Sequence, residues 1–123
     1  MSENTLTIEL DPVPQAPFIA RRSLSNWLQS IDCAEETKLD AVLAASELVA
    51  NGVVHTQSPL QLVAMFDDGR LRLEVHDHDH TPPRLRTDEE VGGYGLKIVS
   101  CIADGWGWEP TPAGKRVWVE TLC

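Results

Sequence analysis

Hydrophobic and polar residues alternate near the start of the chain. Leu6, Ile8 and Leu10 are separated by polar residues, which is the period of a half-buried strand, and the proline-rich residues 11–17 end it. Apolar side chains then recur at helical spacing, at Ala20, Leu24, Trp27, Leu28 and Ile31. The pattern therefore predicts a first strand followed by an amphipathic helix.

A second, more apolar helix is expected after residue 32. Asp32 can cap its N-terminus, and Glu35 and Glu36 fall in the first turn, where the helix dipole favours acidic side chains. Residues 41–54 are almost wholly apolar. We expect this helix to be largely buried and to run to about His55.

The second half of the chain contains two predicted hairpins. Segments 60–66 and 70–77 have strand character and are joined by an Asp-Asp-Gly turn, and residues 105–122 indicate two more strands around Ala113-Gly114. A loop and a third helix, from the glycine cluster to Ile102, separate the hairpins. This order predicts an α+β fold, a two-layer sandwich of a mostly antiparallel sheet with helices packed on one face.

Length and composition restrict the class of protein. The 123 residues suit a single domain, 1–123, and 42% hydrophobic residues can form one core. The first ten residues lack the pattern of a secretory signal, and no apolar run approaches the roughly 20 residues of a membrane span. A cytoplasmic protein with no membrane contact is expected.

Charge and cysteine content exclude further classes. The net charge of −9 opposes direct nucleic-acid binding and favours a basic or neutral protein partner. Cys33, Cys101 and Cys123 show no CxxC spacing, so neither a disulfide framework nor a thiolate zinc site is expected. Cys33 and Cys101 are expected to be small core residues.

Glu47 and Asn51 interrupt the apolar second helix. They are four residues apart and project from one face of the helix. They could simply mark its solvated side. Alternatively, a carboxylate beside a carboxamide oxygen could hold Mg²⁺ and position a proton acceptor.

Two other features break the local pattern. Asp77 lies on the same face of its strand as Leu71, Leu73 and Val75, which is the inward-facing side. It is therefore either a buried acceptor for a ligand NH group or a cap of the next turn. Glycines at 92, 93 and 95 open the third helix. Such a cluster lets backbone N–H groups approach phosphates, although an ordinary loop would have the same composition.

In this order, the three features resemble the nucleotide site of the GHKL superfamily of gyrases, heat-shock chaperones, histidine kinases and mismatch-repair ATPases. ELVANGVVH is similar to its Glu-x-x-x-Asn box, EVHD to its adenine-binding Asp box, and GYGLKIV to its second glycine box. Residues 20–28 and 105–120 resemble the anti-sigma-factor and serine-kinase branch. The resemblance covers almost the whole chain and implies a Bergerat-type ATP-binding fold.

The resemblance also implies a role for each matching residue. Asn51 would coordinate Mg²⁺ bridging the ATP phosphates, Asp77 would accept from the adenine amino group, and Glu47 would act as general base on a partner's Ser or Thr hydroxyl or on water. The remaining cofactor-binding residues form the glycine box: Gly93, Tyr94, Gly95, Leu96 and Lys97.

The implied function is an ATP-dependent switch. It would hold a sigma factor, phosphorylate an anti-sigma-factor antagonist as a serine/threonine-protein kinase, and form a homodimer. Arg21 and Arg22 on the first helix are candidate partner contacts or an ordinary solvated face.

The first glycine box departs from the family pattern. The family has Asp-x-Gly-x-Gly, whereas this chain has Asp77-His78-Asp79-His80-Thr81. The change removes freedom for positive φ and adds a negative charge near the ligand. It favours a second interpretation, a partner-binding module of the same fold without phosphate transfer.

Zinc binding is a third possibility. His76, His78 and His80 would share one face if the strand continued past Asp77. Pro82 and Pro83 end the strand, however, and solvated loop histidines are the better explanation.

Overall fold

Two helices and five strands make up the described part of the chain. The computed structural model describes residues 4–83 and 104–123. In chain order the elements are β1 (Asn4–Leu10), α1 (Ala16–Leu28), α2 (Glu35–Thr56), β2 (Leu60–Asp67), β3 (Arg70–Asp77), β4 (Gly105–Pro110) and β5 (Lys115–Leu122).

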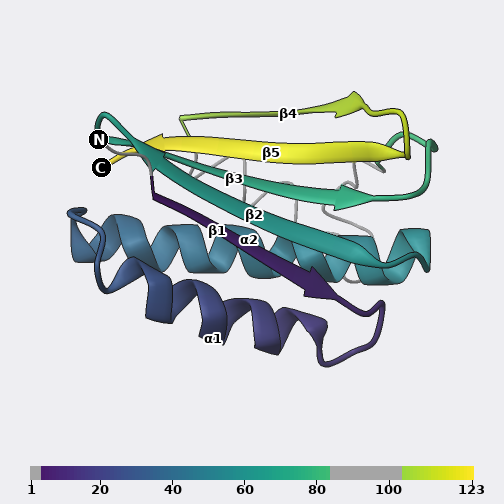
Figure 1. Cartoon of the computed structure of the whole chain (residues 1–123), viewed down its shortest axis with the longest axis horizontal. Coiled ribbons are helices and arrows are strands. Elements are labelled where there is room, and N and C mark those ends of the chain that lie inside the picture. The colour runs from purple at the N-terminus through teal and green to yellow at the C-terminus, as the bar shows by residue number, and fades with distance from the viewer. Residues whose placement is uncertain (1–3, 84–103) are drawn as a thin grey trace, which may run out of the picture.

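The strands form one antiparallel sheet with the order β1-β2-β3-β5-β4. Both helices lie on the same side of this sheet, with α2 running along it, as Figure 1 shows. The predicted α+β sandwich is therefore confirmed. The third predicted helix, which begins at the glycine cluster, lies outside the described residues.

Alternate residues of the strands build the core against the helices. The register aligns Leu62 of β2 with Val75 of β3, and Val75 with Val117 of β5, so that one apolar row crosses the sheet. From the helix layer, Leu24 and Val49 are fully buried against this face. The two-residue period of the strands and the apolar stripe of each helix thus give the two layers one common core.

The helix boundaries agree with the sequence pattern except at two places. Ile31 is buried, but α1 already ends at Leu28. The prediction that Asp32 caps the second helix is wrong, because α2 begins at Glu35 and its N-cap is Ala34, without a side-chain cap. The C-terminus of α2 lies at Thr56, one residue past the predicted end, and Gln57 terminates it in the left-handed conformation.

The expectation that no disulfide forms is also wrong. Cys33 and Cys123 are bonded, with their Cα atoms 4.6 Å apart and a sequence separation of 90. The α1–α2 connection and the end of β5 lie at the same end of the molecule (Figure 1), which brings the two thiols together. Cysteine spacing carries no information about such a long-range approach.

Neither helix in residues 4–83 and 104–123 has both the length and the apolar character of a membrane span.

Candidate functional site

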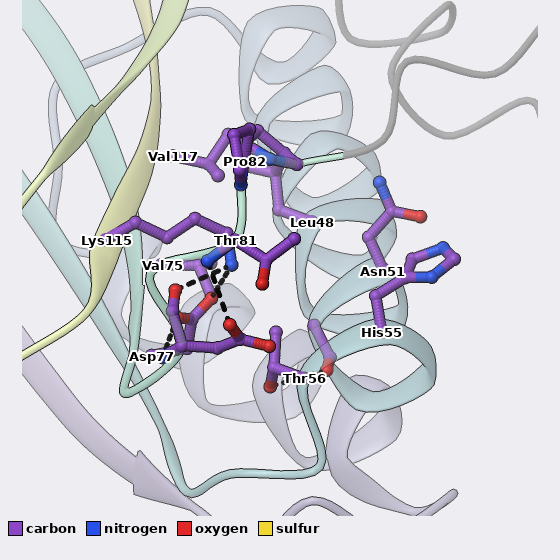
Figure 2. A pocket seen from close by; sticks show the side chains of 13 residues that line it. Leu48, Asn51, His55, Thr56, Val75, Asp77, Thr81, Pro82, Lys115 and Val117 are labelled. Atoms are coloured by element: carbon purple, nitrogen blue, oxygen red, sulfur yellow. Dashed lines mark hydrogen bonds and ion pairs between the residues drawn. The ribbon is translucent and has the colours of Figure 1, made fainter.

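A cavity of about 260 Å³ lies between α2 and the adjoining ends of β3 and β5. Figure 2 shows α2 supplying side chains on one side and the sheet on the other. The lining residues are Leu48, Asn51, Gly52, His55, Thr56, Val75, Asp77, Asp79, Thr81, Pro82, Pro83, Lys115 and Val117. Most of the wall area is apolar, and seven of the thirteen lining residues bring a polar side chain to it, a combination that suits a small-molecule site.

Asp77 is the most deeply buried acid of the cavity. It ends β3 on the core-facing side, continuing the row of Leu73 and Val75, and its side chain is 4% exposed. Its Oδ2 atom lies 3.1 Å from Nζ of Lys115, whose side chain is 5% exposed. The register explains the pairing, since Asp77 and Lys115 are directly opposed on neighbouring strands. A buried ion pair therefore forms part of the cavity wall.

The segment after Asp77 is held by side chains that bond to the backbone. Oδ1 of Asp77 accepts the Asp79 N–H at 2.8 Å, and Oδ1 of Asp79 accepts the Thr81 N–H at 2.9 Å. The latter bond lowers the pKa of the Asp79 carboxyl. The capping role considered for Asp77 is thus real, and it coexists with the position of Asp77 in the cavity.

These two turns also show how the chain manages without the family's first glycines. Within the described residues, a positive φ outside glycine occurs at Gln57 and Asp68, neither of which is in the 77–81 segment. The segment therefore bends without the left-handed conformations that glycine would permit. Asp79 stands where the family has a glycine, and its side chain stabilises the turn by accepting the Thr81 N–H.

Gly114 allows β5 to start close to this segment. A Cβ atom at position 114 would lie 2.6 Å from the Asp79 nitrogen and 2.6 Å from Cα of His78, and it would also overlap the carbonyl oxygen of Asp77. No side chain fits there without moving backbone. The glycine thus brings Lys115 within reach of Asp77.

The helix side of the cavity carries Asn51 and His55, one turn apart. Asn51 is half-buried and lines the cavity together with Leu48 and Thr56. Glu47 is also half-buried and lies one turn before Asn51, outside the set of lining residues. The structure thus places Asn51 and Asp77 on facing sides of one cavity, with Glu47 farther along the helix. The predicted cofactor residues Gly93, Tyr94, Gly95, Leu96 and Lys97 lie outside the described part of the chain.

The residues of the cavity fit the base of a nucleotide. Its volume is slightly below the range of about 300–1,000 Å³ for drug-sized ligands, which suits one ring system. Leu48, Val75 and Val117 offer apolar contact to a flat ring, and Asp77 offers an acceptor. Asn51 could supply a single amide oxygen to Mg²⁺, which ordinarily keeps several waters and phosphate oxygens as further ligands.

The three histidines do not assemble into a metal site. His76 contacts Glu74 at 2.7 Å, and His80 contacts the carbonyl oxygen of Thr111 at 3.0 Å. In the two described ranges there is no group of three His, Cys, Asp or Glu side chains arranged to hold a metal ion.

Sequence reasoning did not identify Lys115, Thr56 or Thr81 as parts of the cavity. Lys115 could have been found, because it follows the turn glycine and occupies the inward-facing phase of β5, where a lysine is unusual. Thr56 and Thr81 carry no such signal, since threonine is common at helix ends and in loops.

The chain is similar to known proteins in sequence and in fold. Residues 11–121 match the family model described as histidine kinase-like ATPase domain. No curated protein is similar enough in sequence to be matched. Among solved structures, the chain is similar to the crystal structure of the RsbU and RsbW domains of Rv1364c from Mycobacterium tuberculosis, at 22% sequence identity and a TM-score of 0.76.

The similarity covers 97% of this chain and 32% of the mycobacterial chain, so this chain spans about a third of that protein's length. At this identity the likeness supports the fold alone. The family model covers most of the sequence, including both sides of the cavity. The chain therefore belongs to the histidine kinase-like ATPase family.

Proposed function

We propose that this chain is a Mg²⁺-dependent ATP-binding regulator that holds a sigma factor and phosphorylates a Ser or Thr of an antagonist protein. One observation carries the nucleotide part of the proposal. A buried carboxylate, Asp77, faces an apolar-walled cavity with Asn51 on the opposite side, on the fold of an ATPase family. The 123 residues would act as one ATP-binding domain.

Asp77 is the proposed acceptor for the adenine 6-amino group. A carboxylate has about four lone-pair sites, and the observed bonds to Lys115 and the Asp79 N–H use two of them. Guanine carries a carbonyl where adenine has this amino group, so ATP should bind more tightly than GTP.

Asn51 and the glycine box are the proposed phosphate side of the site. The amide oxygen of Asn51 would bind Mg²⁺, and Gly93, Tyr94, Gly95, Leu96 and Lys97 would surround the phosphates. A net charge of −9 repels polyphosphate, so the phosphates need local positive potential, which backbone amides and a bound metal would supply. The Asn51→Ala variant should lose the Mg²⁺-dependent part of the affinity.

Glu47 is the proposed general base. Bound ATP would supply a transferable phosphoryl group. The Glu47 carboxylate would take the proton of the attacking hydroxyl and leave its oxygen as the nucleophile. Because this proton transfer involves the attacking group, Glu47→Ala should keep ATP affinity and lose phosphate transfer. Equal loss of ATP binding in Glu47→Ala and Asn51→Ala would instead indicate a damaged helix.

The partner assignment rests on the resemblance of residues 20–28 and 105–120 to the anti-sigma branch. The RsbW domain of the similar mycobacterial structure is consistent with it. A sigma-factor partner implies a cytoplasmic location, and the branch implies a homodimer. Arg22 is exposed on α1 with its guanidinium 5.9 Å from the Phe18 ring, and Arg21 donates to Oγ of Ser46 at 2.8 Å. Arg22 is thus the better candidate for a partner contact.

A second candidate function is nucleotide-dependent partner binding without phosphate transfer. Asp79 lies in the cavity wall where the family has a glycine, and its carboxylate adds negative charge near the nucleotide. The two functions are separated by incubating the protein with labelled Mg-ATP and a candidate antagonist. Labelled Ser or Thr that disappears in Glu47→Ala supports the kinase, whereas tight ATP binding with no transfer supports the second function.

A further inference from the structure

Lys115 is a buried cation that the function proposed above does not use. Its side chain is 5% exposed, and it lines the same cavity as Asp77. Removing an ammonium and a carboxylate from water costs free energy that their mutual attraction often fails to recover. Stability alone therefore gives a weak reason for a lysine at this position.

Two of the three N–H donors of Lys115 have acceptors in the described part of the chain. An ammonium group has three N–H donors. Among the described residues, Nζ of Lys115 has two acceptors: Oδ2 of Asp77 at 3.1 Å and the carbonyl oxygen of Asp79 at 3.0 Å. Figure 2 shows Lys115 extending from β5 toward Asp77 within the group of side chains that line the cavity. The cavity thus presents a donor and an acceptor side by side.

A neighbouring donor and acceptor are complementary to a ligand edge that has one of each. The adenine ring has this arrangement, since its 6-amino group donates and the adjacent N1 accepts. A carboxylate alone would recognise only the amino group. We propose that Lys115 donates a hydrogen bond to N1 of the adenine ring and, with Asp77, determines the base specificity of the site. This inference rests on the proposed ATP function and adds a residue to it.

A purely neutralising role for Lys115 makes a different prediction. If the ammonium only balanced the charge of Asp77, the ligand atom at ring position 1 would not matter. The comparison of ATP with 1-deaza-ATP, in which a carbon replaces N1, distinguishes the two roles without changing the protein. The matched control ligand is 7-deaza-ATP, which also lacks one ring nitrogen but keeps the 6-amino and N1 edge.

The experiment is isothermal titration of the full chain with each Mg-nucleotide. We expect 1-deaza-ATP to bind about tenfold or more weakly than ATP, because a hydrogen bond from a charged donor is lost. We expect 7-deaza-ATP to bind within about threefold of ATP. In Lys115→Met, with folding checked by circular dichroism, the gap between ATP and 1-deaza-ATP should close.

Each other outcome overturns the inference. Equal binding of ATP and 1-deaza-ATP by the parent would leave the ATP site intact and remove the role of Lys115. A full gap that persists in folded Lys115→Met would assign N1 to another donor. Absence of ATP binding by the parent would overturn this inference together with the proposed function. If Lys115→Met does not fold, Lys115→Gln takes its place, because its amide keeps an N–H donor and should retain part of the gap between ATP and 1-deaza-ATP; loss of the whole gap or no change in it would overturn the inference.

Discussion

Replacing Lys115 by Met should destabilise the protein far more than the loss of an exposed charge would, because the Lys115 side chain is buried. The substitution keeps most of the side-chain volume and removes the ammonium. The Asp77 carboxylate, 4% exposed, would keep only its bond from the Asp79 N–H. Breaking a buried ion pair from one side typically costs about 3–5 kcal/mol, because the remaining charge is left unpaired. This pair borders a cavity, so we expect the lower end, about 3 kcal/mol.

The double variant tests the reason for this loss. In Asp77→Asn with Lys115→Met, both charges are gone and Asn can still accept the Asp79 N–H. The free energy of unfolding should therefore recover, with a coupling energy of about 1–3 kcal/mol between the two sites. Urea unfolding of the parent, both single variants and the double variant measures it.

Arg116→Met is a matched control on the same strand. Arg116 forms an ion pair with Glu109 in which both side chains are more than a third exposed. An exposed pair of this kind contributes about 0–1 kcal/mol. The explanation fails if Lys115→Met costs no more than Arg116→Met, or if the losses from Asp77→Asn and Lys115→Met are additive within about 0.5 kcal/mol.

Three more variants test individual contacts elsewhere in the fold. Gly114→Ala should lower the free energy of unfolding by about 3 kcal/mol in urea titration, because the added Cβ overlaps neighbouring backbone; a loss under 1 kcal/mol would contradict this close approach. Burial raises the pKa of the Glu74 carboxyl, but the hydrogen bonds and charges of Arg72 and His76 lower it by more, so that this pKa lies below its ordinary value of 4.5. The stability that Glu74 contributes is therefore present above pH 4.5 and lost as pH falls below it, so the gap between parent and Glu74→Gln in urea unfolding should close in acid; a constant gap would refute the assignment. Cys33→Ser should lower the free energy of unfolding by about 4 kcal/mol under oxidising conditions, because the bond to Cys123 closes a long loop between positions with a sequence separation of 90, and reductant should abolish the difference.

Much of the fold could be predicted because it depends on local periodicity. Leu71, Leu73 and Val75 alternate with polar residues, and the same alternation predicts that Asp77 lies on the inner face of its strand. The α2 helix was predictable from the long run of apolar residues at positions 41–54. Its N-cap was not, because several residues before a helix can serve as its cap and the backbone decides among them.

Features that join distant segments could not be predicted from local pattern. The pairing of Asp77 with Lys115 depends on the register of β3 and β5, which are 38 positions apart at this pair (115 − 77). The disulfide between Cys33 and Cys123 likewise depends on the fold, which brings the α1–α2 connection close to the end of β5. The sequence motifs of the family contain Asn51 and Asp77, which line the cavity. A motif gives no information about residues outside it, and Lys115 lies on the neighbouring strand.

Titration of Mg-ATP into the parent and into Asp77→Asn tests the central claim most directly. We predict that the parent binds Mg-ATP more tightly than Mg-GTP, that the affinity falls when Mg²⁺ is chelated, and that Asp77→Asn binds at least about tenfold more weakly, since its amide can turn a donor toward the adenine amino group. Parent and variant should show the same circular dichroism spectrum. Equal ATP affinity in the two proteins, or no ATP binding by the parent, would contradict the assignment of this cavity to an adenine nucleotide.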